Sequence, residues 1–183
     1  MEVVCNLRHH PEVVKILSDK GIVGDIKLHF DQLFDIIRYV SRLLSAVVAD
    51  HENITDFEIC ELFDFLLTKF KESANQAAAL TCIYQILHAV PINKFVSVLE
   101  EEFLDDVEEF VRVQNGRLHI GVASIGYQTL SSIIRKSFKE LPQQMKSLVC
   151  SKIITLEECM ACTFRWHLDS DQLVPLMREI ARA

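Results

Sequence analysis

The segment Ser73–Asn93, SANQAAALTCIYQILHAVPIN, contains no Asp, Glu, Lys or Arg, and this limits how the chain can fold. A helix that spans a membrane needs about 20 consecutive and mostly apolar residues. This segment is instead interrupted by polar residues, namely Asn75, Gln76, Thr81, Gln85 and His88. An uncharged helix outside a membrane must be covered by protein on most of its sides. The segment therefore predicts a helix enclosed by other helices in a soluble protein, with no membrane span.

Helical periodicity continues over most of the chain. In residues 31–50 and again in residues 56–70, apolar side chains recur at spacings of three and four, which indicates one buried face of a helix. Asp31 is placed to cap the first of these helices. Leu118–Ile134 is a further segment without charged residues. Because no pair of segments shows the pattern of paired strands, the predicted fold class is all-α.

The expected helices repeat at a regular interval. Four equivalent corners, where a long apolar helix ends and a shorter one begins, fall at Leu7, Val48, Ala89 and Ile134, with spacings of 41, 41 and 45 residues. A period of about 40 residues with one enclosed helix per unit is typical of a helical solenoid. We therefore expect a single domain over residues 1–183, with units at approximately 1–30 (partial), 31–71, 72–115 and 116–183. The long helices would form the spine, and the shorter charged ones the outer layer.

One unit carries a recognisable motif. The segment PEVVKILSDKGIVGDIKLHF resembles the armadillo-repeat signature, in which a short helix ends at a Gly and apolar positions begin the next helix. The matching residues are Ile16, Leu17, Gly21, Ile22, Val23, Ile26 and Leu28, and Asn6 falls where the family often has Asn at the end of its third helix. The later units lack the Gly and are equally similar to HEAT repeats.

The resemblance implies a right-handed α-solenoid of about four armadillo- or HEAT-like repeats. Proteins of this family are scaffolds whose third helices line a concave groove that holds a peptide or a partner protein. Residues 2–7, EVVCNL, read as the last turns of a spine helix, so we expect this chain to be the C-terminal part of a longer protein.

One subclass of this family does not fit the sequence. Nuclear-import receptors carry a Trp and an Asn, four residues apart, on successive third helices. The only Trp here is Trp166, and the positions equivalent to Asn6 are Val47, His88 and Ile134. Recognition of a basic targeting peptide is therefore not expected.

Polar residues on the spine helices form the candidate partner-binding groove. Helical spacing places them on one stripe of each helix, and Arg and Tyr are frequent anchors at protein interfaces. The stripes consist of Arg38, Ser41, Arg42 and Ser45; Thr81, Tyr84, Gln85 and His88; and Ser124, Tyr127, Gln128, Ser131 and Arg135. The alternative interpretation is a plain solvated face on each helix.

The cysteines offer a different kind of site. Cys159 and Cys162 form a C-x-x-C pair, and with Cys150 and His167 they would complete a four-ligand zinc site. No Gly makes a turn at this pair, and the surrounding pattern is that of a continuous helix, so packing cysteines are the favoured interpretation. A zinc- or thiol-dependent module remains the alternative. The six cysteines are read as reduced thiols of an intracellular protein, in the cytoplasm or nucleus; they are Cys5, Cys60, Cys82, Cys150, Cys159 and Cys162.

Two further charged or polar groups have simple interpretations. His9 and His10 precede Pro11, which suits the first position of a helix, and they are read as a corner rather than a metal site.

The acidic run in residues 99–110 lacks the Gly and ligand spacing of a calcium loop. It is read as a solvated outer face, with attraction of a basic partner or a cation as the alternative. Its acids are Glu100, Glu101, Glu102, Asp105, Asp106, Glu108 and Glu109.

The functional prediction is a scaffold or adaptor that binds a protein or peptide. The formal net charge of −7 makes nucleic-acid binding unlikely, because nucleic-acid binders usually present a basic face. No Gly-rich phosphate loop, nucleophile elbow or H-E-x-x-H motif is present, so no enzymatic activity and no cofactor is expected. Self-association into a homodimer is the alternative within the binding class.

Overall fold

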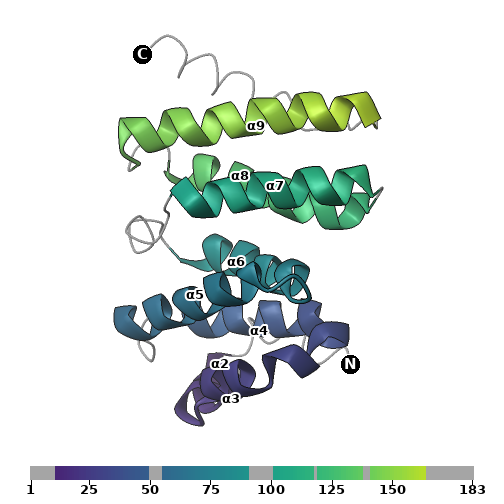
Figure 1. Ribbon diagram of the computed structural model, residues 1–183. Coiled ribbons are helices and arrows are strands. Elements are labelled where there is room, and N and C mark those ends of the chain that lie inside the picture. Colours follow the sequence, from purple (N-terminus) through teal and green to yellow (C-terminus); the bar gives the residue numbers. More distant parts are fainter. Residues whose placement is uncertain (1–10, 50–54, 91–100, 118, 138–140, 164–183) are drawn as a thin grey trace. The chain divides into compact units, whose positions relative to one another are not determined.

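A computed structural model describes residues 11–49, 55–90, 101–117, 119–137 and 141–163 (Figure 1). These residues are helical apart from short turns, and no strand occurs among them, which confirms the predicted all-α class. The chain divides into two compact units, Met1–Leu99 and Glu100–Ala183. The division falls within the third expected repeat, 72–115.

The described part of the first unit contains five α-helices and two short 3₁₀ turns. The helices are α2 (Pro11–Asp19), α3 (Ile22–His29), α4 (Ile37–Ala49), α5 (Asp56–Lys71) and α6 (Gln76–Ala89), and the turns are η2 (Phe30–Gln32) and η3 (Phe34–Ile36). Of these, α4 and α6 pack on one another most extensively, and α5 also packs on α6.

Gly21 joins α2 to α3 in the way that the sequence predicts. Its φ of 72° lies in the left-handed region, which glycine adopts without steric cost because it has no Cβ. Its N–H donates to the carbonyl of Ser18 at 2.9 Å and so closes the end of α2. The helix–Gly–helix arrangement expected from the motif is therefore present.

The helix expected to begin at Asp31 begins six residues later. The chain makes the turns η2 and η3 before α4 starts at Ile37, so the prediction that Asp31 caps this helix is wrong. Asp31 Oδ1 instead accepts hydrogen bonds from Lys69 Nζ at 2.8 Å and from Asn75 Nδ2 at 2.9 Å. Asp31 thus binds the end of α5 and the residue just before α6.

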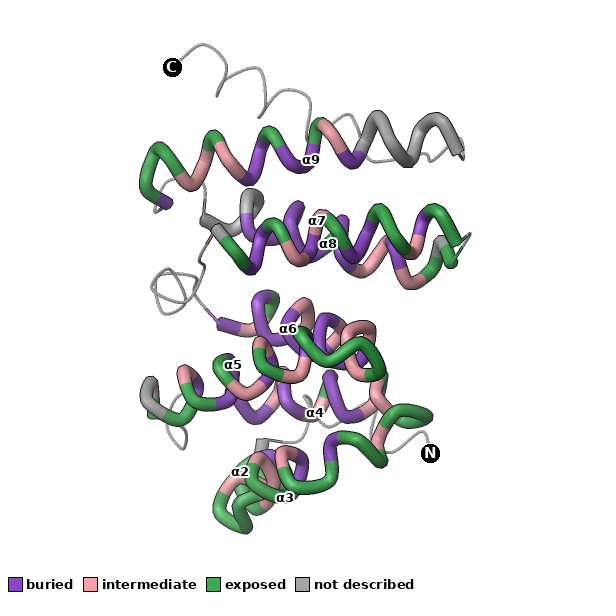
Figure 2. The backbone as a smooth tube through the Cα atoms, in the orientation of Figure 1, coloured by how far each residue is buried: buried purple, intermediate pink, exposed green. Residues whose placement is uncertain are grey.

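The uncharged helix α6 is enclosed as predicted (Figure 2). Half of its residues are buried, namely Ala78, Ala79, Leu80, Cys82, Ile83, Ile86 and Leu87. They pack with buried side chains of α4 and α5, among them Leu44, Val47, Leu62, Phe63 and Leu66. The core of the first unit is therefore built around α6.

A capping box begins α5. The hydroxyl of Thr55 accepts a hydrogen bond from the backbone N–H of Glu58, and the Glu58 carboxylate accepts one from the backbone N–H of Thr55. This satisfies donors that the first turn of a helix leaves without partners. Backbone and side-chain hydrogen bonds from Thr55 also lower the pKa of Glu58.

The described part of the second unit consists of α7 (Glu101–Gly116), α8 (Ile120–Ser137) and α9 (Gln143–Thr163), and each packs on the other two. Their common core includes Leu104, Val107, Leu130, Val149 and Ile153. Among the described residues of both units, no helix has the length and apolar character needed to cross a membrane.

Candidate protein-binding surface

A hydrogen bond connects the two stripes expected on α4 and α6. Ser45 Oγ of α4 donates to the backbone carbonyl of Gln85 of α6 at 3.1 Å, and the two residues are 40 positions apart. Both side chains are half-buried. The border between the two helices therefore carries polar groups within reach of solvent. We call Arg38, Arg42, Ser45, Thr81, Tyr84, Gln85 and His88 the α4–α6 strip.

On α6, this strip is the least buried side of the helix. Thr81, Tyr84 and Gln85 are half-buried and His88 is exposed. The rings of Tyr84 and His88 meet edge to face, with centroids 4.6 Å apart and planes at 83°. Thr81 Oγ1 donates to the carbonyl of Ala77 at 2.7 Å. On α6 the strip thus presents the aromatic pair Tyr84 and His88, which lie one turn apart. The Thr81 hydroxyl lies on the same side and is hydrogen-bonded to the backbone of α6.

On α4, the exposed polar residues are the two arginines. Arg38 and Arg42 are exposed and stand one turn apart, on the same side as Ser45 by helical spacing. Ser41 differs from the expectation because it is buried and its Oγ donates to the carbonyl of Arg38 at 3.1 Å. The structure therefore brings the α4 and α6 stripes together, but without Ser41.

The stripe expected on α8 does not form one open surface. Tyr127 and Ser131 are 4% and 6% exposed, so the expectation that they face solvent is wrong. Both α7 and α9 pack on α8, which leaves this helix little open surface. Gln128 is exposed, and Ser124 is half-buried with its Oγ donating to the carbonyl of Gly121 at 2.8 Å. The side chain of Arg135 lies outside the described residues.

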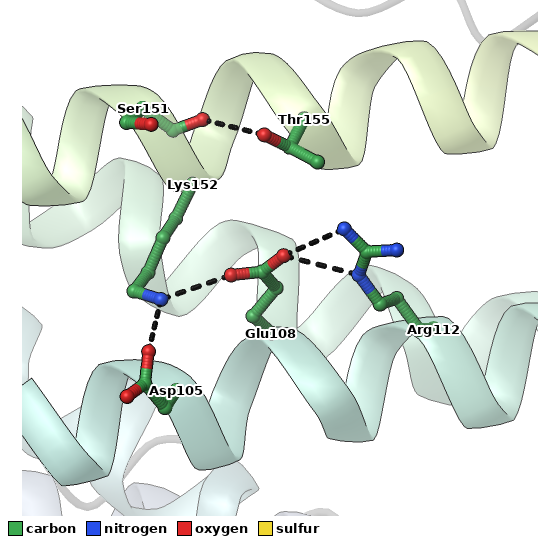
Figure 3. Close-up of polar contacts among 6 residues, drawn as sticks. All are labelled: Asp105, Glu108, Arg112, Ser151, Lys152 and Thr155. Carbon is green, nitrogen blue, oxygen red and sulfur yellow. Dashed lines mark hydrogen bonds and ion pairs between the residues drawn. The ribbon is translucent and has the colours of Figure 1, made fainter.

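Part of the acidic run on α7 is engaged with α9 (Figure 3). Lys152 Nζ contacts the carboxylate of Asp105 and donates to Glu108 Oε2 at 2.9 Å. Arg112 binds the other oxygen of Glu108 at 2.8 Å. Glu102, Asp105 and Glu109 are exposed as expected, whereas Asp106 and Glu108 are half-buried; Glu100 and the side chain of Glu101 lie outside the described residues. The interpretation of the run as an entirely solvated face is therefore wrong at Asp106 and Glu108.

Burial and charge act in opposite directions in this network. Burial alone raises the pKa of Glu108, but hydrogen bonds from Lys152 and Arg112 outweigh it and hold that pKa below its usual value. Burial alone lowers the pKa of Lys152, but hydrogen bonds to Asp105 and Glu108 raise it. Both groups therefore stay charged at neutral pH. Such a network holds two helices together and shows no proton poised for transfer.

Sequence reasoning missed Lys152. Its side chain is 9% exposed, and it lies within an apolar face of α9 beside Val149, Ile153 and Leu156. A lone Lys among core positions was the available signal, because a buried ammonium requires an acidic partner. The identity of that partner, 44 residues away in the sequence, required the structure.

Two buried cysteines, Cys82 and Cys150, are poorly suited to thiol chemistry. Burial raises the pKa of Cys150, and it raises the pKa of Cys82 to about 12, whereas a reactive cysteine needs a lowered pKa. Cys159 and Cys162 lie within α9, as the continuous-helix interpretation predicts, but their side chains lie outside the described residues. Among the described side chains, no three metal-binding groups gather in a way that could hold an ion. Asn6, His9, His10, Trp166 and His167 also lie outside the described residues.

Comparison with models of known protein families, with curated proteins and with solved structures finds no match for this chain.

Proposed function

We propose that this protein is a non-enzymatic scaffold whose helices stack as armadillo- or HEAT-like repeats, and that the α4–α6 strip binds a partner peptide or protein. The observation that carries this proposal is the open polar side of α6. This helix is buried on most sides and uncharged, yet it keeps Tyr84, Gln85 and His88 within reach of solvent beside the arginines of α4.

The repeat architecture is supported by the pairing of α4 with α6. Val48, in the last turn of α4, and Ala89, the last residue of α6, are equivalent points of the 41-residue period. The contact between Ser45 and Gln85 joins positions 40 residues apart. The Gly21 link between α2 and α3 agrees with the motif. In a stack of repeats, equivalent helices lie side by side and build one continuous surface.

Position-specific crosslinking tests the binding surface. A photoreactive phenylalanine analogue replaces Tyr84 in one variant and Arg117, an exposed residue of the second unit, in a control. After irradiation in an extract of the source cells, we expect a crosslinked protein with the Tyr84 variant only. The purified partner should then bind Arg42→Glu about tenfold more weakly than the wild type. Equal crosslinking at both positions, or unchanged affinity of Arg42→Glu, would contradict the proposal.

Self-association is the second candidate, and exposed apolar side chains of the first unit favour it. Leu28 of α3 is 76% exposed and Phe34 of η3 is 56% exposed, and exposed apolar surface favours association. Light scattering of the purified chain distinguishes a dimer from a monomer. The variant Leu28→Asp/Phe34→Asp should return a dimer to the monomeric state. A wild type that stays monomeric at high concentration would exclude this candidate.

A further inference from the structure

Few side chains hold α2, α3 and the turns η2 and η3 to the core of the first unit (Figure 2). We call residues 11–36, which contain these elements, the α2–η3 segment. Among its described side chains, those that are buried are Val14, Ile26 and Phe30. Its exposed large apolar side chains are Val13, Ile16, Leu28, Phe34 and Ile36. The segment therefore adds little to the core and leaves apolar surface in solvent.

The backbone of this segment departs from the helical conformation at two residues, His29 and Leu33. Their φ values are −109° and −94°, and their ψ values are 13° and 6°. Rotations of about 30° to 55° would bring both residues to α-helical values, near −63° and −42°. The turns η2 and η3 would then extend α4 toward its N-terminus. Short 3₁₀ turns next to a helix often mark a hinge, and we therefore regard η2 and η3 as the hinge of this segment.

The apolar spacing of the sequence fits a straightened hinge. Leu33, Ile36 and Ile37 precede the buried Val40 of α4 by seven, four and three residues. In a continuous helix, positions with this spacing lie on the same face. In the observed turn, Ile36 is 42% exposed, and Leu33 and Ile37 are half-buried. These apolar side chains therefore suit a helix that continues through the hinge and meets further protein there.

From these observations we infer that two copies of the chain exchange their α2–η3 segments and so form a domain-swapped dimer. The inference rests on self-association, the second candidate above, and names the element that the two copies exchange. A straightened hinge carries α2 and α3 away from their own core, and a second copy presents the same docking surface to them. The two straightened hinges then form the new contact between the copies, which covers Phe34 and Ile36.

Three contacts hold the segment on α5, and each would join two chains in the dimer. The ring of Phe30 meets that of Phe65 edge to face, with centroids 5.5 Å apart, and Lys27 Nζ lies 5.7 Å from the centroid of the same ring. Asp31 Oδ1 accepts from Lys69 Nζ at 2.8 Å. Because both copies have the same sequence, the exchanged segment finds the same partners on the second copy. The dimer therefore keeps these contacts and adds those between the hinges.

Zero-length crosslinking tests the exchange with the native full chain. Unlabelled and isotope-labelled protein are mixed, unfolded in urea and refolded together, and the dimer is isolated by size-exclusion chromatography. A carbodiimide then joins the Asp31 carboxylate to the Lys69 amine as an amide. Mass spectrometry of the digest gives the isotope content of each crosslink. In a swapped dimer about half of the Asp31–Lys69 crosslinks should join a labelled to an unlabelled peptide, because each of them lies between two chains.

The ion pair of Glu108 with Lys152 is the matched control. It joins the same kinds of group at 2.9 Å, but both residues lie in the second unit, outside the exchanged segment. Its crosslinks should therefore join peptides of one isotope only.

A change in the length of the hinge gives a second test. A short Gly-rich insertion between Leu33 and Phe34 should convert the dimer to a monomer, because a longer and flexible hinge lets the segment fold back onto its own core. The same insertion between Lys20 and Gly21, in the link from α2 to α3, should leave the dimer intact. Light scattering measures the mass of both variants, and circular dichroism checks that their helices are intact.

Three outcomes would overturn the exchange. They are mixed-isotope Asp31–Lys69 crosslinks no more frequent than those of the control pair, absence of the Asp31–Lys69 crosslink from the dimer, and a dimer that survives the hinge insertion. If such a dimer is still dissociated by Leu28→Asp/Phe34→Asp, self-association stands and only the exchange is wrong. If the wild type remains monomeric at high concentration, both are wrong.

Discussion

The hydroxyl of Ser45 on α4 donates to the backbone carbonyl of Gln85 on α6, across a sequence separation of 40 residues. This bond lies at the border of the α4–α6 strip, between two helices that also share the core of the first unit. It therefore affects both the packing of the two helices and the surface proposed to bind a partner.

Ser45→Ala removes this bond, and we expect a loss of about 1 kcal/mol in the free energy of unfolding relative to Ser41→Ala. Ser41 is the matched control because it lies on the same helix and its Oγ donates to the carbonyl of Arg38 within α4, not to another helix that the structure describes. Ala has the same helix propensity advantage over Ser at both positions. Urea unfolding followed by circular dichroism measures the difference. Equal stabilities of the two variants would show that the bond to Gln85 contributes nothing.

Gly21→Ala should destabilise the first unit by about 1 kcal/mol, because only Gly adopts φ near 72° without strain. Gly24→Ala, inside α3, should instead stabilise the unit by about 0.5 to 1 kcal/mol through better helix propensity. Apart from the chain neighbours and the backbone of α3 itself, an added Cβ meets no atom within 4 Å at either position, so packing against other elements does not enter the comparison. Thermal unfolding of both variants tests whether the two changes in stability have opposite signs. A gain in stability for Gly21→Ala would contradict the left-handed link.

Glu108→Gln should lower the free energy of unfolding by about 1.5 kcal/mol, because hydrogen bonds between charged groups contribute more than neutral ones. The neutral amide leaves the ammonium of Lys152 dependent on Asp105, whose side chain is largely exposed. Glu109→Gln is the control, because Glu109 is exposed and adjacent on the same helix. Urea unfolding of both variants measures the effect. If the two substitutions cost the same, the network does not hold α9 to α7.

The same network predicts how stability depends on pH. The pKa of Glu108 is lowered in the folded chain, so its contribution is present above the unfolded pKa of about 4.3 and is lost as pH falls through the folded pKa. The pKa of Lys152 is raised, so its contribution is present below about 10.4 and is lost as pH rises through the folded pKa. Urea midpoints should therefore fall at both extremes of pH. In Glu108→Gln the acid decline should be shallower, and an unchanged decline would contradict this assignment.

The sequence predicts the enclosed helices better than it predicts where they begin. Because α6 carries no charged residue, we expect it to be buried if it does not lie in a membrane, and the structure confirms the burial. Phe34 and Ile36 continue the apolar spacing of α4 and so suggest a longer helix, yet they lie in a 3₁₀ turn and are exposed. Apolar spacing identifies the buried face of a helix, but an apolar residue in the preceding turn satisfies the same pattern.

The sequence predicts only part of the candidate site, because the spacing of polar residues along a helix does not show which of them are buried. Polar residues within an apolar helix indicate either open surface or burial with local hydrogen bonds, and sequence spacing does not separate the two. On α6 the polar residues reach solvent, whereas on α8 Tyr127 and Ser131 are buried. The partners of Lys152 could not be predicted from the sequence, because they depend on how α7 packs on α9. Spacing along one helix can find Arg112 beside Glu108, but it cannot find a contact between helices.

The carboxylate of Asp31 binds Lys69 at the end of α5 and Asn75 at the entrance to α6, and Glu72 binds the same two side chains from within that corner. These contacts join the turn η2, which contains Asp31, to the corner between α5 and α6, about 40 residues later in the chain. Local opening at η2 would remove one of the two carboxylates that hold the Asn75 side chain, and the backbone carbonyl of Asn75 accepts from Ala79 in the first turn of α6. Opening at η2 should therefore raise the amide-hydrogen exchange of the first turn of α6, although the two regions are far apart in the sequence.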